Sequence, residues 1–224
     1  MNGIDLGRAL ASPSKDPKWI SKTLLGGVLL VVPVVNFVIF GALVRRIKMV
    51  CEGDETLPPW NAFGEMWFDG LRFVLAGLAY ELPTALILAP TFVLNGAAGS
   101  AAGPVCPAYL LAFTYSTVAA VVFLAAATNY ARVREFRAFF DFRVILAGIR
   151  TGGYLTAWIF SAAVSLVFNL AFSFPGIGFV LAILAGYVPF LITGHVVGQW
   201  AAKTWPCLPQ EPATAGLGPL STSK

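Results

Sequence analysis

Charged residues are scarce in this chain. Its 224 residues include 15 Lys or Arg and 11 Asp or Glu, which is 12% of the total. Soluble domains carry about twice that share. The scarcity is uneven, because residues 23–44 and 151–202 hold no charge at all. In the same way, residues 73–131 hold only Glu81. This distribution excludes a soluble enzyme and a disordered protein.

Histidine and cysteine are also rare. The only histidine is His195, and the three cysteines are far apart without Cys-x-x-Cys spacing. Catalytic triads and zinc sites need these residue types in defined sets. The sequence therefore predicts no catalytic residues and no metal site, and we do not expect an enzyme.

The long apolar runs are what the chain does have. Each reaches the roughly 18–20 residues that a helix needs to cross hydrocarbon. The two longest runs divide at loops rich in Gly, Ala and Pro, near residues 95–107 and 172–178. We therefore predict an all-α integral membrane helical bundle, a single domain over residues 23–203. Its four transmembrane helices are expected at residues 71–94, 107–130, 150–172 and 177–202, after a first membrane segment at residues 23–44.

The first membrane segment allows two interpretations. It either crosses the bilayer once with a proline kink, or bends between Pro33 and Asn36 and re-enters on the same side. Each arm of such a hairpin is about 24 Å of helix, short of the ~30 Å hydrocarbon core. We expect residues 1–22 to form an amphipathic cytoplasmic segment and residues 204–224 a flexible, proline-rich tail.

The basic residues indicate the orientation. Residues 45–72 contain four Lys or Arg and residues 131–150 contain five, whereas the loops at 95–107 and 173–178 contain none. Positive charge accumulates on the cytoplasmic side of membrane proteins. We therefore expect these two basic loops and both termini to lie in the cytoplasm, with the protein in the inner membrane. Basic flanks of this kind do not indicate a nucleic-acid partner.

Two segments have an amphipathic pattern that suits the headgroup layer. Residues 60–70 and 134–143 place aromatic side chains on one face and charges on the other. We predict two interfacial helices there, although an ordinary elbow between spans has the same pattern. The expected interfacial anchors are Trp60, Phe63, Trp67, Phe136, Phe139 and Phe140.

Three polar residues are expected deep in the membrane. Glu81, His195 and Asn36 each lie eight or nine residues from the nearest basic flank, which is about 12–13 Å of helix. Ionisable groups at this depth normally face a partner or water. We therefore predict that Glu81 and His195 approach each other. Such a pair forms either an ion or proton site or a structural hydrogen bond.

His195 has a further possible role. It stands between Gly194 and Gly198, and small neighbours leave room for a flat macrocycle. A lone imidazole can be the axial ligand of haem or of a chlorophyll-type pigment. Apart from this alternative, we expect no cofactor.

One loop carries a family resemblance. Residues 52–60 read Glu-Gly-Asp-Glu-Thr-Leu-Pro-Pro-Trp, after an Asp-Pro-x-Trp-Ile approach at residues 16–20 and Pro-x-x-Asn-Phe at residues 33–37. Over residues 16–83 the chain resembles the multi-pass membrane family called domain of unknown function 4013. The resemblance implies a membrane protein without an established activity.

The loop also has a physical interpretation as a cytoplasmic elbow that offers a docking surface. Its glycine turns the chain, its carboxylates can pair with Arg45, Arg46 or Lys48, and its prolines stiffen the approach to an interfacial tryptophan. The elbow residues are Gly53, Asp54, Glu55, Leu57, Pro58 and Trp60.

The sequence thus favours a non-enzymatic accessory or scaffold subunit of a membrane complex. Its expected partners are the lipid bilayer and other membrane protein subunits. One alternative is a small ion, proton or solute transporter that uses Glu81, His195 and Asn36. A second alternative is a pigment- or haem-binding subunit that uses His195.

Overall fold

The computed structural model describes residues 3–98 and 105–205, and all regular structure in these ranges is helical. The predicted all-α fold is therefore confirmed. In chain order the elements are α1 (Leu6–Ala11), the 3-10 turn η1 (Pro13–Lys15), α2 (Trp19–Val31), α3 (Phe37–Cys51), α4 (Phe63–Ala98), α5 (Val105–Val133), the 3-10 turn η2 (Phe136–Phe140), α6 (Phe142–Ile149), α7 (Tyr154–Phe172), α8 (Ile177–Ala185) and α9 (Val188–Thr204).

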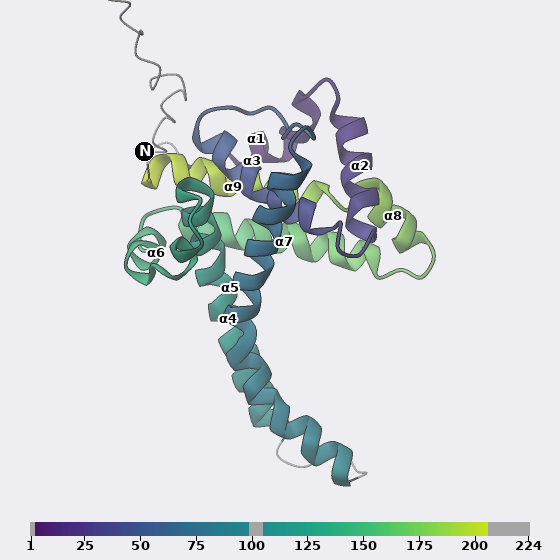
Figure 1. Ribbon diagram of the computed structural model, residues 1–224, viewed down its shortest axis with the longest axis vertical. Helices are drawn as coiled ribbons and strands as arrows, with labels where there is room; N and C mark the ends of the chain where they lie inside the picture. Colours follow the sequence, from purple (N-terminus) through teal and green to yellow (C-terminus); the bar gives the residue numbers. More distant parts are fainter. Residues whose placement is uncertain (1–2, 99–104, 206–224) are drawn as a thin grey trace, which may run out of the picture.

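A long helical hairpin dominates the shape. Helices α4 and α5 lie side by side and extend away from a body made by the other helices (Figure 1). Helices α7 and α9 run across the direction of the hairpin instead of alongside it (Figure 1). Helix α4 has 36 residues. At 1.5 Å per residue it is about 54 Å long, more than the ~30 Å hydrocarbon core.

Several helices are suited to a bilayer. Within the described residues, Phe63–Thr91, Pro107–Val133 and Tyr154–Phe172 are each long and apolar enough to cross it. The pair α8 and α9 makes a fourth candidate, bent by 43°. Many large apolar side chains on these helices are exposed. Because so much apolar surface faces outward, the fold is that of a membrane helical bundle with lipid contact, as the sequence predicts.

The N-terminal membrane segment is bent. Helix α2 ends at Val31, and α3 begins at Phe37 after a turn that contains Pro33. In this turn Val34 has a positive φ of 69°, which a β-branched residue rarely adopts. The indole Nε1 of Trp67 donates a hydrogen bond to the carbonyl of Val34 at 2.8 Å. Contact with α4 therefore holds this turn in its unusual conformation.

Small residues let the helices cross closely. A Cβ atom at Gly41 on α3 would clash with the carbonyl of Met66 on α4, and one at Gly70 would clash with the carbonyl of Phe37. Helices in membranes commonly pack through such small residues. Gly41 and Gly70 therefore fix the crossing of α3 over the base of the hairpin.

The first predicted interfacial helix does not exist as a separate element. Residues 63–70 are the first two turns of α4, which continues without a break into the apolar span. No helix-breaking residue separates the two parts, since the first proline inside α4 is Pro83. The amphipathic pattern of this segment therefore reflects the end of a span that is longer than the bilayer core.

The second predicted interfacial helix is divided. Residues 136–140 form η2, and Asp141 then starts α6 by accepting a hydrogen bond from the Val144 amide at 3.3 Å. Phe136 and Phe140 are exposed, as anchors should be, but Phe139 is fully buried. It stacks on Tyr130 with the ring centroids 4.4 Å apart. Phe139 is thus a core residue and the prediction for it is wrong.

The last two predicted spans also differ in detail. Helix α7 starts at Tyr154, not at residue 150, because Gly153 has a φ of 95° and ends the preceding turn. The predicted span at 177–202 breaks at Gly186 and Tyr187, between α8 and α9. The proline at the start of α9, Pro189, suits the first turn of a helix.

Candidate functional site

The structure separates the polar residues predicted to meet. The Glu81 carboxylate on α4 accepts hydrogen bonds from the hydroxyls of Thr84, at 2.8 Å, and Ser116 on α5, at 3.0 Å. His195 on α9 instead contacts Arg46 and approaches Glu55. The predicted Glu81–His195 pair is therefore wrong. The depth of a residue along a helix does not determine which face of the helix it occupies. In addition, Glu81 lies on the hairpin, which extends away from the body that contains α9 (Figure 1).

Asn36 joins neither of them. It is the N-cap residue of α3, so the chain from Asn36 to Arg45 is helical as expected, but Asn36 itself lies in the turn before the helix. Its side-chain oxygen is buried and accepts no hydrogen bond from the described residues. Asn36 therefore belongs to the bend of the N-terminal segment.

A fully buried arginine lies at the centre of the body. Arg46 Nη1 donates to the backbone carbonyls of Glu55, at 2.9 Å, and Thr56. Its Nη2 lies 3.0 Å from Nδ1 of His195, which is also fully buried. Because an arginine is always a donor, Nδ1 is the acceptor and the imidazole carries its hydrogen on Nε2. Arg46 thus ties the elbow loop to α9.

Sequence reasoning missed this arginine, which it treated as one of several basic residues after the first span. The available signal was Gly194. A Cβ atom there would press on the Arg46 side chain, so the glycine makes the space that the arginine occupies. From the sequence, this glycine indicates either room for a macrocycle or close helix packing, and neither interpretation identifies Arg46 as its neighbour.

The N-terminal segment covers the elbow loop. The Glu55 carboxylate forms ion pairs with Arg8 and with Lys15, the latter at 3.0 Å. Burial alone would raise the pKa of Glu55, but the hydrogen bonds from Lys15 and Arg8 outweigh it and hold this pKa below its ordinary value. The elbow carboxylates were expected to pair with Arg45, Arg46 or Lys48. Glu55 instead uses partners from the N-terminal segment.

A second ion pair repeats this pattern. Asp16 accepts from Lys22 Nζ at 2.7 Å and from the Leu57 amide at 3.2 Å. Burial would raise the pKa of Asp16, but hydrogen bonds from Lys22, Lys18 and Leu57 lower it below its ordinary value. Asp16 therefore joins the start of α2 to the elbow.

The elbow itself is a built turn. Gly53 has a φ of 88°, and Asp54 accepts a hydrogen bond from the Thr56 amide at 2.8 Å. Leu57 and Pro58 are buried in the protein. Trp60 is half-buried and packs on Tyr187, with ring centroids 5.5 Å apart. The apolar part of the elbow thus faces the protein's own core.

His195 does not fit a tetrapyrrole. The spaces beside Gly194 and Gly198 are filled by the side chains of Arg46 and Val50. Nδ1 of His195 accepts from Arg46, and Nε2 is buried. A flat macrocycle would have to displace α3 to reach this ring.

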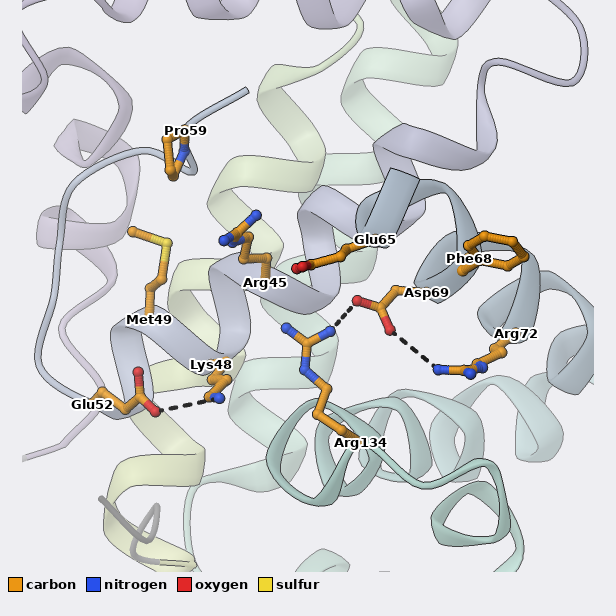
Figure 2. A pocket seen from close by; sticks show the side chains of 10 residues that line it. All are labelled: Arg45, Lys48, Met49, Glu52, Pro59, Glu65, Phe68, Asp69, Arg72 and Arg134. Carbon is orange, nitrogen blue, oxygen red and sulfur yellow. Dashed lines mark hydrogen bonds and ion pairs between the residues drawn. The ribbon is translucent and has the colours of Figure 1, made fainter. Parts of the chain in front are cut away.

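A polar pocket of about 670 Å³ opens where α3 ends and α4 begins (Figure 2). The Asp69 carboxylate in it is paired with Arg134 and with Arg72 at 3.8 Å, and it accepts a hydrogen bond from the Tyr130 hydroxyl at 2.6 Å. Seven charged side chains line the pocket: Arg45, Lys48, Glu52, Glu65, Asp69, Arg72 and Arg134. No local sequence pattern marks this cluster, because its members come from three separate segments. Within the described residues, no group of three or more His, Cys, Asp or Glu side chains could hold a metal ion.

An all-helical fold with several long apolar helices defines this chain as an integral membrane protein. Residues 25–177 match the family described as protein of unknown function (DUF4013), and the chain belongs to that family. The resemblance noted in the sequence is thereby confirmed. No curated protein and no solved structure matches the chain.

Proposed function

We propose that the protein is a non-enzymatic accessory subunit of a membrane complex. It binds partner transmembrane helices through the side of the α4–α5 hairpin that carries Glu81. Glu81 carries this proposal, because it is a partly exposed carboxylate in the middle of a helix that otherwise faces lipid.

The carboxylate of Glu81 requires hydrogen-bond donors, because it lies within a candidate membrane span. A charged group at the centre of a bilayer costs at least ~2.5–3.5 kcal/mol. A carboxylate has about four acceptor sites, and Glu81 uses two of them for the hydroxyls of Thr84 and Ser116. Acceptor capacity therefore remains on the exposed side, where a donor from a neighbouring helix can reach it.

The hairpin is also accessible to a partner. It extends away from the body (Figure 1), and large apolar side chains on both of its helices are exposed. They include Leu78 on α4 and Leu110 and Phe113 on α5. A partner can therefore pack along the hairpin without displacing any other helix of the chain.

The transporter alternative loses its main support. It required Glu81, His195 and Asn36 to share one site, and the structure places them in three separate environments. Glu81 alone remains for that role, so transport becomes an outcome that the experiment must distinguish.

A photo-crosslinking residue at Leu78 tests the proposal. Leu78 lies one turn before Glu81 and is 63% exposed, while Leu166 on α7, 60% exposed, is a matched control on another apolar helix. We expect Leu78 to give one discrete protein adduct in the membrane, and Leu166 to give none. Glu81→Leu should abolish the adduct.

Two results would contradict the proposal. Equal adduct patterns from Leu78 and Leu166 would show that the hairpin has no preferred partner. Loss of a liposome ion flux in Glu81→Gln, without any adduct, would favour the transporter instead.

A further inference from the structure

The charged pocket lies at the level where candidate spans end. Arg45 and Lys48 come from the last turns of α3, Asp69 and Arg72 from the first turns of α4, and Arg134 follows the last residue of α5. Lipid headgroups occupy this level of a bilayer. The pocket is thus placed to meet a headgroup, whichever side of the membrane it faces.

The pocket carries a net positive charge. Four basic and three acidic side chains line it. The acidic charge is largely used within the protein, because Asp69 is paired with Arg134 and Arg72, and Glu52 lies 3.8 Å from Lys48. The side chain of Arg45 is half-buried, and it forms no ion pair or hydrogen bond with any described residue. An anion in the pocket would therefore meet an uncommitted guanidinium.

The backbone at Arg134 supports a defined site. Arg134 has a φ of 63°, a conformation that costs free energy for a residue other than glycine. Its amide donates to the carbonyl of Tyr130 at 2.7 Å. This geometry lets the side chain turn back toward Asp69 beside the pocket (Figure 2). Such strain is commonly retained at ligand-binding positions.

An apolar stripe leads from the pocket along α4. Phe68 lines the pocket and is 58% exposed, and Leu75 and Leu82 follow at intervals of seven residues. Residues spaced by seven lie on one face of a helix. Glu81 is turned toward α5, where it accepts a hydrogen bond from Ser116, and lies about 100° around the helix from Leu82 in this stripe. A ligand in the pocket thus has charge at one end and apolar surface at the other.

We propose that this pocket binds the phosphate of an anionic phospholipid. Arg45 contacts the phosphate, Arg72 and Lys48 add to the positive potential, and an acyl chain lies along Phe68, Leu75 and Leu82. Basic pockets at the ends of transmembrane helices recognise anionic headgroups by the same chemistry. This proposal does not depend on the accessory function.

Native mass spectrometry of the full chain in detergent tests the proposal, with phosphatidylglycerol and phosphatidylcholine as the added lipids. We expect phosphatidylglycerol to bind more tightly. Arg45→Gln should weaken the binding of phosphatidylglycerol about fivefold. Each basic residue near an anionic lipid contributes about 1 kcal/mol, which corresponds to about a fivefold change in affinity. Glu65→Gln, which removes an exposed carboxylate from the pocket, should strengthen it.

Arg143→Gln is the matched control. It removes the same charge from an exposed arginine on α6 outside the pocket, and should leave lipid affinity unchanged. Equal affinities for Arg45→Gln and Arg143→Gln would overturn the proposal. Displacement of phosphatidylglycerol by millimolar inorganic phosphate would also overturn it, and would assign the pocket to a soluble phosphate compound.

Discussion

A buried charged residue, Arg46, is held by hydrogen bonds that the sequence does not reveal. Arg46 lies in the body of the protein without a carboxylate in direct contact, and three acceptors share its guanidinium. Removal of one partner from a buried polar network leaves the others unsatisfied. Arg46 is therefore expected to contribute more to folding than the exposed arginines do.

Substitution of Arg46 by glutamine should destabilise the protein by about 2–3 kcal/mol, because the carbonyls of Glu55 and Thr56 and the His195 ring lose their donor. Thermal unfolding in detergent measures this effect, and Arg45→Gln is the neighbouring control. Since Arg45 has no partner among the described residues, its variant should unfold near the wild-type temperature. Equal unfolding temperatures for both variants would show that Arg46 has no structural role.

The sequence could not have revealed the partner of His195. Depth arithmetic uses distance along a helix, whereas contact depends on which helices pack together and on the faces they present. Burial of a charged residue such as Arg46 is a tertiary property, since it depends on the space left by Gly194 and on carbonyls from the elbow loop. Neither the space nor the position of the carbonyls produces a periodic pattern or a characteristic residue spacing in the sequence.

At the scale of elements, apolar length and glycine positions determine the architecture. The apolar runs and the bend near Pro33 were predictable, because both follow from local properties of the chain. The end points of α4 and α9 were not, since helices continue or break according to contacts with their neighbours. The start of α4 is an example, because its amphipathic pattern predicts a separate surface helix, whereas in the structure it continues directly into the apolar span.

The crossing of α3 and α4 predicts a steric effect. Gly41→Ala and Gly70→Ala should each destabilise the protein by about 1–3 kcal/mol, because a methyl group would push apart two backbones in contact. Chemical or thermal unfolding in detergent measures the effect. Gly64→Ala is the control, since it lies in α4 with open space around it and should be neutral or slightly stabilising.

The N-terminal segment should detach in acid. The pKa values of Glu55 and Asp16 are lowered in the folded protein, so their ion pairs add stability above the ordinary values of 4.5 and 3.8. This contribution is lost as the pH falls through the lowered folded values. The protection of residues 5–22 against hydrogen exchange, relative to the intrinsic rate at each pH, should therefore fall below about pH 4. Glu55→Gln should show faster exchange at neutral pH and a weaker pH dependence; an unchanged profile would contradict the assigned ion pairs.

At the scale of the whole molecule, the contacts of the N-terminal segment bear on membrane topology. The carbonyl of Gly3 accepts from Lys203, and Asp5 exchanges hydrogen bonds with Gln199. We therefore expect the N-terminal segment and the end of α9 to lie on one side of the membrane. Between them are up to four candidate crossings, which is an even number. If all four cross, we expect the segment made by α2 and α3 to enter and leave on the same side.

Helix lengths agree with this conclusion. Helices α2 and α3 have 13 and 15 residues. They are about 20 and 22 Å long, and neither crosses a ~30 Å core alone. In their shared bend, Trp67 on α4 satisfies the backbone carbonyl of Val34, as irregular backbone at membrane depth requires. The side chains of Val32, Pro33 and Val34 are exposed. We therefore expect a re-entrant hairpin, the interpretation that the basic residues of the N-terminal segment also favour.

Cysteine accessibility in intact cells tests this topology. In a background with the native cysteines replaced by alanine, single cysteines at Ser14, Thr151 and Ser173 are treated with a membrane-impermeant maleimide. All three positions are exposed, and Thr151 lies 3.2 Å from Thr204 at the end of α9. We expect Ser173→Cys to react, and Ser14→Cys and Thr151→Cys to react only after the membrane is opened. If Ser14→Cys instead behaves like Ser173→Cys, α2 and α3 cross the membrane as one kinked span, and the contacts between Asp5 and Gln199 cannot form in the membrane.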